Sequence, residues 1–575
     1  MLKTLLKCVR EFKKHSILAP LYVSMEVVME VIIPLLMANL IDNGINKGDT
    51  NYIMVLGIAL VISCLISLAF GALSGRSAAI ASAGFAKNLR RDMFCNVQDF
   101  SFENIDRFSN ASLITRLTTD VTNLQNAYQM IIRVAVRSPI MLIFSMIMAF
   151  AVNKNLALVF LCVVPVLAVG LYFIMTKAHP IFKKVFKTYD KLNLIVQENI
   201  RGIRVVKSFV REDYEVEKFN KISDEIYSDF SRAERLLAFN SPLMQFCMYS
   251  CTLLISWLGA KLIVGGTMSE GELVSIITYA SQILMSLMMV SMIIVMITIS
   301  KASAERICEV LEEKSTLANC ENPIFDIENG DIEFKNVNFG YSKNKFCLKN
   351  INVKINSGET VGIIGGTGSS KSSFVQLIPR LYDVLEGEVL VSGKDVREYD
   401  IKTLRDSVSM VLQKNVLFSG TIKENLRWGC ENATDEQIKE AAKAAQAHGF
   451  IESFPDKYDT FIEQGGANVS GGQKQRLCIA RALLKKPKIL ILDDSTSAVD
   501  TKTDSLIQKA FKEQIPDTTK IIIAQRISSV QHADKIIVLN GGVIDAVGTH
   551  TELLENNDIY RQVYTSQNKG GEENA

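Results

Sequence analysis

The chain has 575 residues, so we expect more than one domain. Its 63 Lys and Arg residues nearly balance its 61 Asp and Glu residues, which argues against a protein that binds nucleic acid through bulk positive charge. Apolar residues make up 48% of the chain, and the long uncharged runs end at Lys301. The composition therefore predicts a membrane-embedded half followed by a soluble half.

Six apolar stretches in the first half are long enough for membrane-spanning helices, which need about 20 residues each. We expect the spans at about 16–42, 51–75, 127–153, 155–176, 236–260 and 273–300, within a transmembrane domain of residues 1–301. The basic, amphipathic stretch before the first span predicts a helix at the membrane interface.

The 11 cysteines have no CxxC or Cys/His spacing, and we interpret them as reduced packing residues.

The connections between the spans alternate in length. The first, third and fifth are short, whereas the second and fourth are long, charged and helix-like. Lys and Arg concentrate in the two long connections and at the N-terminus, so the positive-inside rule places both termini and both long connections in the cytoplasm. We therefore expect long helices that project from the membrane toward the soluble half.

Charged residues interrupt two of the spans. Glu26 and Glu30 lie four residues apart on the first span and share one helix face. Because a charge near the bilayer centre costs about 2.5–3.5 kcal/mol, we expect both to face protein or water. Two interpretations stay open: a polar patch in a substrate cavity that receives cationic groups, or a structural pairing with another helix. Arg133 and Arg137 repeat the spacing on the third span, where we expect them to extend toward the inner headgroups.

The second half predicts a polar linker at 302–330, a soluble domain at 331–567 and a polar tail at 568–575. Within the domain, VGIIGGTGSSKSSF (361–374) reads as an apolar strand, a Gly-rich turn, a lysine and a helix, which is a phosphate-binding loop in its usual context. Lys371 would reach the β- and γ-phosphates, and Ser372 would coordinate Mg²⁺. The residues expected to hold the nucleotide here are Gly365, Gly366, Thr367, Gly368, Ser369, Ser370, Lys371, Ser372 and Ser373.

One position of this phosphate loop departs from the usual pattern G-x-x-x-x-G-K-[ST]. Ser370 stands where a glycine normally precedes the lysine. A serine tolerates positive φ poorly, and the backbone strain would cost about 1–3 kcal/mol. We expect an altered loop geometry that still binds nucleotide.

Two further motifs follow in the same domain. ILILDD (489–494) reads as a buried strand that delivers Asp493 and Asp494 to a sheet edge, where Asp493 would hold magnesium. Between the two phosphate motifs lies NVSGGQKQRLCIARAL, in which a Ser-Gly-Gly turn opens a helix. The free N–H groups of such a turn can bind an anion.

These motifs, together with the order of membrane half and ATPase half, resemble an ATP-binding cassette (ABC) exporter half-transporter. More narrowly, the chain resembles the degenerate-site subunit of bacterial heterodimeric multidrug exporters. The resemblance covers essentially the whole chain. It implies a multi-domain membrane protein, with a six-helix all-α transmembrane domain followed by an α/β P-loop ATPase domain. ATP and Mg²⁺ are the implied ligands, and the plasma membrane of a bacterium is the implied location.

The resemblance also implies roles for individual residues. Tyr341 would stack on adenine, and Gln413 would sense magnesium and contact the transmembrane domain. Asp500 ends the turn STSAVD, which would couple the two nucleotide sites. Short coupling helices are expected at about 103–115 and 206–220. The signature turn, which would complete a site on the partner's cassette, consists of Ser470, Gly471, Gly472 and Gln473.

Three residues depart from the family's pattern at one nucleotide site. Asp494 stands in place of the catalytic glutamate, Gln525 in place of the switch histidine, and Ser370 in place of the loop glycine. A side chain that accepts a proton raises a reaction rate by about 10²–10⁴-fold, provided that it lies within hydrogen-bond distance of the group that loses the proton. We expect a carboxylate that is shorter by one methylene to lose much of this gain. We therefore expect a site that binds ATP and hydrolyses it slowly.

The expected function is ATP-driven export of amphiphilic small molecules, in complex with a second, non-identical half-transporter that carries the missing glutamate and histidine. Four alternatives stay open. The cargo could be a peptide or a lipid, the protein could be an ATP-binding membrane sensor that moves nothing, or an aspartate could suffice for an active homodimer. No nucleic-acid partner is expected.

Overall fold

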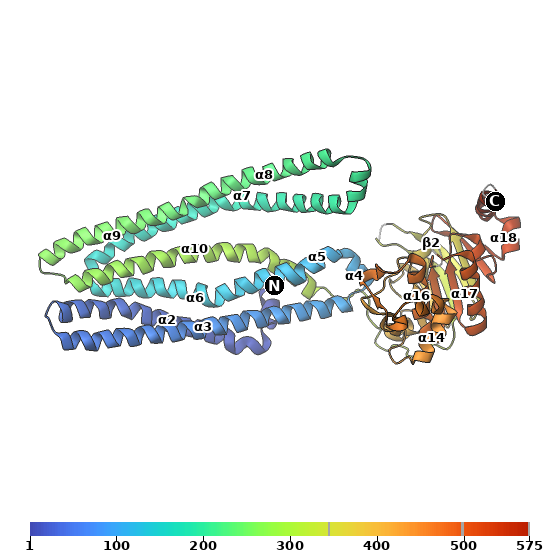
Figure 1. Ribbon diagram of the computed structural model, residues 1–575, viewed down its shortest axis with the longest axis horizontal. Coiled ribbons are helices and arrows are strands. Elements are labelled where there is room, and N and C mark those ends of the chain that lie inside the picture. The colour runs from blue at the N-terminus through green and yellow to red at the C-terminus, as the bar shows by residue number, and fades with distance from the viewer. Residues whose placement is uncertain (343–344, 496–498, 573–575) are drawn as a thin grey trace. The chain divides into compact units, whose positions relative to one another are not determined.

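The computed structural model describes residues 1–342, 345–495 and 499–572, and it divides into two compact units (Figure 1). The first unit comprises Met1–Gln98 and Asn110–Glu313, and the second comprises Asp99–Ser109 and Lys314–Ala575. The segment Asp99–Ser109, which we call the connecting segment, thus comes from the second connection between spans but packs with the soluble half.

The first unit is built of helices. Its main helices are α1 (Leu2–Lys7), α2 (Lys13–Asn39), α3 (Thr50–Asp99), α5 (Asn110–Thr115), α6 (Val121–Val152), α7 (Lys154–Ser208), α8 (Glu212–Ala238), α9 (Asn240–Val264) and α10 (Glu270–Glu312). Six helical segments are long and apolar enough to cross a membrane, which confirms the six predicted spans. Helices satisfy every backbone polar group internally, as a lipid environment requires.

Several helices run beyond the expected spans. α3 continues to Asp99 and α7 to Ser208, so both helices are longer than the expected spans. The predicted linker, however, begins too early, because α10 continues through Glu312. Apolar side chains of this extension, including Ala304, Ile307 and Val310, are buried against the first unit, so the helix is maintained by packing.

The second unit contains two main sheets. The larger sheet has the order β12-β11-β3-β10-β9-β6 and is parallel except for β12; the other has the order β2-β1-β4-β5 and is antiparallel. Its strands are β1 (Ile332–Phe339), β2 (Leu348–Ile355), β3 (Thr360–Gly365), β4 (Glu386–Val391), β5 (Lys394–Asp395), β6 (Val408–Val411), β7 (Gly420–Thr421), β8 (Phe461–Ile462), β9 (Ile489–Asp493), β10 (Thr519–Ile523), β11 (Lys535–Asn540) and β12 (Val543–Gly548).

The α-helices of the second unit are α4 (Phe102–Arg107), α11 (Lys371–Gln376), α12 (Ile401–Ser407), α13 (Ile422–Arg427), α14 (Asp435–Ala444), α15 (His448–Glu452), α16 (Gly471–Leu484), α17 (Thr501–Gln514), α18 (His550–Asn556) and α19 (Asp558–Glu572). The last helix continues past residue 567, so the predicted polar tail starts as helix and not as an extended end.

Buried parallel strands fix the place of the site. All residues of β9 and β10 are buried, as expected for strands covered on both faces. Because β3, β10, β9 and β6 run parallel, their carboxyl ends lie at one edge of the sheet, where ligands bind in folds of this kind. The register places Ile523 of β10 beside both Asp493 of β9 and Ile363 of β3.

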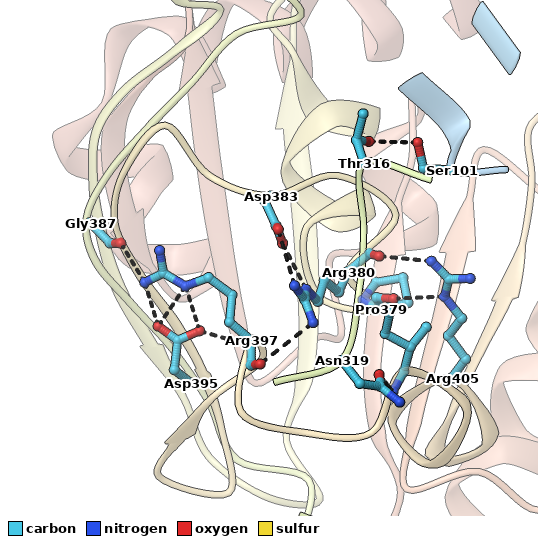
Figure 2. A network of polar contacts seen from close by, with 11 residues as sticks. Ser101, Thr316, Asn319, Pro379, Arg380, Asp383, Gly387, Asp395, Arg397 and Arg405 are labelled. Carbon is cyan, nitrogen blue, oxygen red and sulfur yellow. Dashed lines mark hydrogen bonds and ion pairs between the residues drawn. The ribbon is translucent and has the colours of Figure 1, made fainter. Parts of the chain in front are cut away.

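The loop after α11, residues 377–385, is held by hydrogen bonds from two arginines. Arg380 is buried with φ at 50°, in the left-handed region that favours glycine. Figure 2 shows its guanidinium on both oxygens of Asp383, and Arg405 donating to the carbonyl oxygens of Pro379 and Arg380. These bonds hold Tyr382, in the middle of the loop, in a defined position.

The connecting segment is attached to this unit by polar contacts. The Ser101 and Thr316 hydroxyls are 2.7 Å apart (Figure 2), and Asn104 Nδ2 donates to the carbonyl oxygen of Lys314. Tyr382 donates its hydroxyl to Asp106 Oδ2 at 2.6 Å. The short helix α4 therefore lies where a coupling helix was expected.

Candidate functional site

The phosphate loop leaves the carboxyl end of β3 at Gly365. A Cβ atom at Gly365 would collide with the carbonyl oxygen of Leu539, so the close approach of β11 requires a glycine there. Gly368 and Ser370 have φ of 80° and 67°. Ser370 therefore occupies a left-handed position, which carries the strain of about 1–3 kcal/mol expected for a residue with a side chain.

Lys371 places a positive charge inside this loop. Its Nζ donates to the carbonyl oxygens of Gly365 and Gly366, each at 2.9 Å. Burial lowers the pKa of Lys371, and the nearby carboxylates of Asp493 and Asp494 oppose that shift. The ammonium thus lies inside the loop, near the carboxylates at the end of β9.

Ser372 and Asp493, the residues expected to hold the metal, are joined by a side-chain hydrogen bond. Asp493 is 3% exposed, burial raises its pKa, and a hydrogen bond with the Ser372 side chain opposes that rise. A hydroxyl beside a carboxylate fits Mg²⁺, which binds one or two protein oxygens together with phosphate oxygens and waters. Gln413 lies two residues beyond β6, exposed at the same edge of the sheet.

Asp494 and Gln525 contact each other at the ends of neighbouring strands. Gln525 Nε2 donates to Asp494 Oδ2 at 2.8 Å. The backbone of Asp494 is in the left-handed region, with φ at 48°, and its N–H donates to the carbonyl oxygen of Ile523. An amide can orient the carboxylate in this way, but it cannot take up or release a proton near neutral pH.

Tyr341 is 57% exposed and lies beside α11, the helix that follows the phosphate loop. Its hydroxyl lies 2.9 Å from Ser373 Oγ and donates to Gln376 Oε1 at 3.2 Å, so the ring is tethered to α11. The ring of Tyr382 packs against it edge to face, with centroids 5.2 Å apart. This exposed aromatic face suits a nucleobase.

The signature turn, residues 470–473, caps the N-terminus of α16. Ser470 Oγ accepts from the backbone N–H of Gln473, and Gln473 Oε1 accepts from the backbone N–H of Ser470. In the described part of the chain, no hydrogen bond or ion pair joins this turn to the phosphate loop. Gly471 at the start of α16 is exposed, and the free N–H groups of a helix N-terminus can bind an anion.

Asp500 has a local structural role. Its carboxylate accepts from the backbone N–H of Thr503 and caps α17, and this hydrogen bond lowers the pKa of Asp500. Thr496, Ser497 and Ala498, in the turn that precedes it, lie outside the described residues.

Three charged residues of the spans, Glu26, Glu30 and Arg137, form one cluster. Arg137 Nη1 pairs with Glu26 Oε1, and Nη2 donates to both carboxylate oxygens of Glu30 at 2.8 Å. The expectation that Arg137 extends toward the headgroups is therefore wrong, because two carboxylates on α2 hold its guanidinium. Of the two interpretations of Glu26 and Glu30, the structure contains the pairing with another helix.

The sequence analysis did not predict two of the contacts near the site. Tyr382 and Asp106 are 276 positions apart in the chain, and no local pattern predicts that they meet. Gln567 contacts the backbone of the segment that carries Gln525. Its spacing from Tyr560, Val563 and Tyr564 on one helical face was a usable signal for this second contact.

Comparison with known proteins covers both halves. The family model described as "ABC transporter transmembrane region" matches residues 17–287, and the model described as "ABC transporter" matches 348–497. The chain is 39% identical to the Bacillus subtilis protein "Uncharacterized ABC transporter ATP-binding protein YfiB", over 92% of this chain and 91% of that protein. It is 33% identical to the "ATP-dependent lipid A-core flippase" of Desulfotalea psychrophila, over 84% of each chain.

A solved structure, "Structure of a bacterial Atm1-family ABC exporter with ATP bound", shares the fold with a TM-score of 0.84 at 22% identity. The alignment covers 96% of this chain and 99% of that chain. The fold of the whole chain, with six spans followed by an ATPase unit, is therefore that of an exporter.

Proposed function

The chain belongs to the ABC transporter family, as a multi-pass membrane protein with an ATP-binding domain, and on that premise we propose a specific role for it. It is one half of a heterodimeric exporter. Its own nucleotide site holds ATP and hydrolyses it slowly, while its signature turn completes the faster site of a different subunit. The ATP-binding domain and both termini lie in the cytoplasm, and the complex exports amphiphilic small molecules across the plasma membrane.

One observation supports the slow site above all others. The side chain that would accept a proton, Asp494, is short, and one of its oxygens already accepts a hydrogen bond from Gln525. Neither the shortened carboxylate nor the amide reproduces a glutamate and an imidazole working together. Ser370, on the same site, adds a strained left-handed residue to the phosphate loop.

The remaining residues of the site are suited to binding. Lys371 and the loop N–H groups would hold the phosphates, and Tyr341 would support the base. Ser372 and Asp493 would hold Mg²⁺, which neutralises phosphate charge when bound. A nucleotide held in this way favours the closed pair of cassettes, and this difference in affinity between states turns the transmembrane cavity outward.

The intact signature turn supports the need for a partner. In a homodimer both sites would carry Asp494 and Gln525, so both would turn over slowly. In a heterodimer, the turn at 470–473 serves a phosphate loop whose own chain supplies a glutamate and a histidine.

Lipid export is the second candidate for the cargo. It is favoured by the similarity to a protein described as a lipid A-core flippase. Vesicles that contain the purified complex distinguish the candidates: uptake of a fluorescent amphiphilic amine indicates drug export, and translocation of a labelled lipid indicates flipping. Stimulation of ATP turnover by neither cargo would indicate a sensor that transports nothing.

The proposal is tested by restoring the missing groups. Asp494→Glu and Gln525→His are introduced singly and together into the full chain, and ATP turnover is measured. We expect the pair to raise the turnover of this site by at least about 10-fold, because proton-accepting catalysis is worth about 10²–10⁴-fold. An unchanged turnover in the double variant would contradict the explanation based on the shortened carboxylate.

A further inference from the structure

The last helix of the chain packs against the ATPase unit through one face. Tyr560, Val563, Tyr564 and Gln567 recur on α19 at the spacing of a single helical stripe. Tyr560 is fully buried with its hydroxyl 2.7 Å from His550 Nδ1, and Val563 and Tyr564 pack against the core that includes Ile527. The apolar contacts therefore anchor α19 beside the segment 524–530, which we call the switch loop.

Gln567 continues this stripe and contacts the switch loop directly. Its Oε1 accepts from the backbone N–H of Ile527 at 2.9 Å, and its Nε2 donates to the backbone carbonyl of Gln525 at 2.8 Å. One side-chain amide thus pairs with two backbone groups two residues apart, as a neighbouring strand would. The pairing fixes the backbone of residue 525 whatever its side chain is.

The same backbone carries the side chain that reaches Asp494. Gln525 Nε2 donates to Asp494 Oδ2, so the chain of contacts runs from α19 through Gln567 and residue 525 to the acid at the end of β9. A second contact holds the loop farther on, where Ser529 Oγ donates to Asp504 Oδ2 of α17 at 2.8 Å. Gln567 is the contact that lies nearest in sequence to residue 525.

We propose that Gln567 is a positioning residue of this nucleotide site, and that the C-terminal helix controls hydrolysis there by fixing the backbone of residue 525. The inference rests on the proposed function, because it assumes that residues 494 and 525 act on the attacking water. It adds a part of the chain, α19, to which the nucleotide motifs assign no role.

A purely structural role makes a different prediction. If Gln567 only stabilised α19, its removal would lower stability and leave the chemistry of correctly folded molecules unchanged. If it positions residue 525, its removal lowers kcat for ATP while KM stays constant, because the phosphate loop and Tyr341 are untouched. Misplacement of a catalytic group by about 1 Å can cost about 10²-fold.

The test uses the full-length chain with Asp494→Glu and Gln525→His, in which the site is expected to turn over. Gln567→Ala is added to this variant, and Gln562→Ala, an exposed change on another face of α19, is the matched control. We expect Gln567→Ala to lower kcat about 10-fold with KM within about twofold, and Gln562→Ala to change neither. Gln567→Glu, which keeps the acceptor for Ile527 N–H and loses the donor, should lie between them.

Hydrogen exchange in the chain with its natural residues 494 and 525 gives the second readout. Gln567→Ala should accelerate exchange at the Ile527 amide, and exchange within β9 should stay unchanged. Faster exchange with an unaltered kcat would overturn the positioning role, as would equal kcat for the Gln567 and Gln562 variants. If the Asp494→Glu, Gln525→His chain itself fails to turn over, both the proposed function and this inference fall.

Discussion

Single residues decide what this nucleotide site can do. Asp494 keeps the charge of a catalytic acid but not its reach, and Gln525 keeps a hydrogen bond but not a titratable group. Asp493 and Lys371 lie near each other with opposite charges, and burial raises the pKa of Asp493 and lowers the pKa of Lys371. On the proposed function, the site keeps the groups expected to bind a nucleotide and alters those expected to hydrolyse it.

The raised pKa of Asp493 predicts the pH dependence of metal binding. Its carboxylate must be ionised to hold Mg²⁺, so metal-dependent ATP affinity is present above the raised pKa and is lost as the pH falls through it. We expect the loss to begin above the usual aspartate range of about 3.9. Titration of ATP affinity with and without Mg²⁺ measures this. Metal dependence that persists unchanged through that range would contradict it.

The ion cluster of the spans predicts a stability effect. Arg137→Met leaves the carboxylates of Glu26 and Glu30 without their shared cation, which costs about 3–5 kcal/mol for a buried charge. We expect a markedly lower thermal midpoint in detergent, and its recovery when Glu26→Gln and Glu30→Gln are added. Arg133→Met, one helical turn away, is the control. Equal midpoints for the two single arginine variants would rule out the cluster as a stabilising element.

Among the elements, a chain of contacts links the connecting segment to Tyr341, the residue expected to stack on adenine. Tyr382 donates to Asp106 of α4, and its ring touches that of Tyr341. Burial, and then the hydrogen bond to Asp106, raise the pKa of Tyr382, so its hydroxyl stays protonated and donates at neutral pH. Arg380 and Arg405 make hydrogen bonds within the loop 377–385, which contains Tyr382 (Figure 2).

The contacts of Tyr382 with Asp106 and Tyr341 predict a variant in which ATP turnover no longer responds fully to cargo. Tyr382→Phe keeps the ring and removes the donor, so ATP binding should change less than about twofold while cargo-stimulated turnover of the complex falls severalfold. Tyr399→Phe, which removes a hydroxyl bonded to the carbonyl oxygen of Val391 in the same unit, is the matched control. Cargo stimulation that is equal in the two variants would show that the Asp106 contact carries no coupling.

The elements also show how far the sequence predicts this fold. The lengths of the apolar stretches predicted six spans, and the structure confirmed them. This prediction succeeded because hydropathy is averaged over a whole helix and depends little on any single residue. The end of α10 was missed because its extension is stabilised by Ala304, Ile307 and Val310 packing on other helices, which local composition does not reveal. The sequence predicted that a serine at position 370 would meet a left-handed backbone, because the loop pattern itself demands that conformation.

Within the site, the sequence predicted residues that strand ends bring together and missed those that distant segments bring together. Asp493, Asp494 and Gln525 follow buried parallel strands, and their proximity follows from the sheet. Asp106 reaches Tyr382 only through the attachment of a segment from between two spans. Arg137 was placed wrongly because the pairing of two helices, and not the periodicity of either, decides where a guanidinium points.

For the whole molecule, the proposed slow site calls for a second subunit. The chain combines a six-span membrane unit with an ATPase unit in the manner of an exporter, and its signature turn is intact. Two copies of it would form two slow sites. Under the proposed function, a partner that carries a glutamate and a histidine supplies the faster hydrolysis, and this chain supplies the slow ATP site.

The central claim is tested most directly by the ATP turnover of the purified full-length chain, alone in liposomes, beside the complex formed with its co-purified partner. We predict that the chain alone binds ATP and hydrolyses it at least about 10² times more slowly than the complex, the lower end of the loss expected for a missing proton acceptor. Brisk turnover by the chain alone, with accumulation of cargo in the vesicles, would contradict the claim.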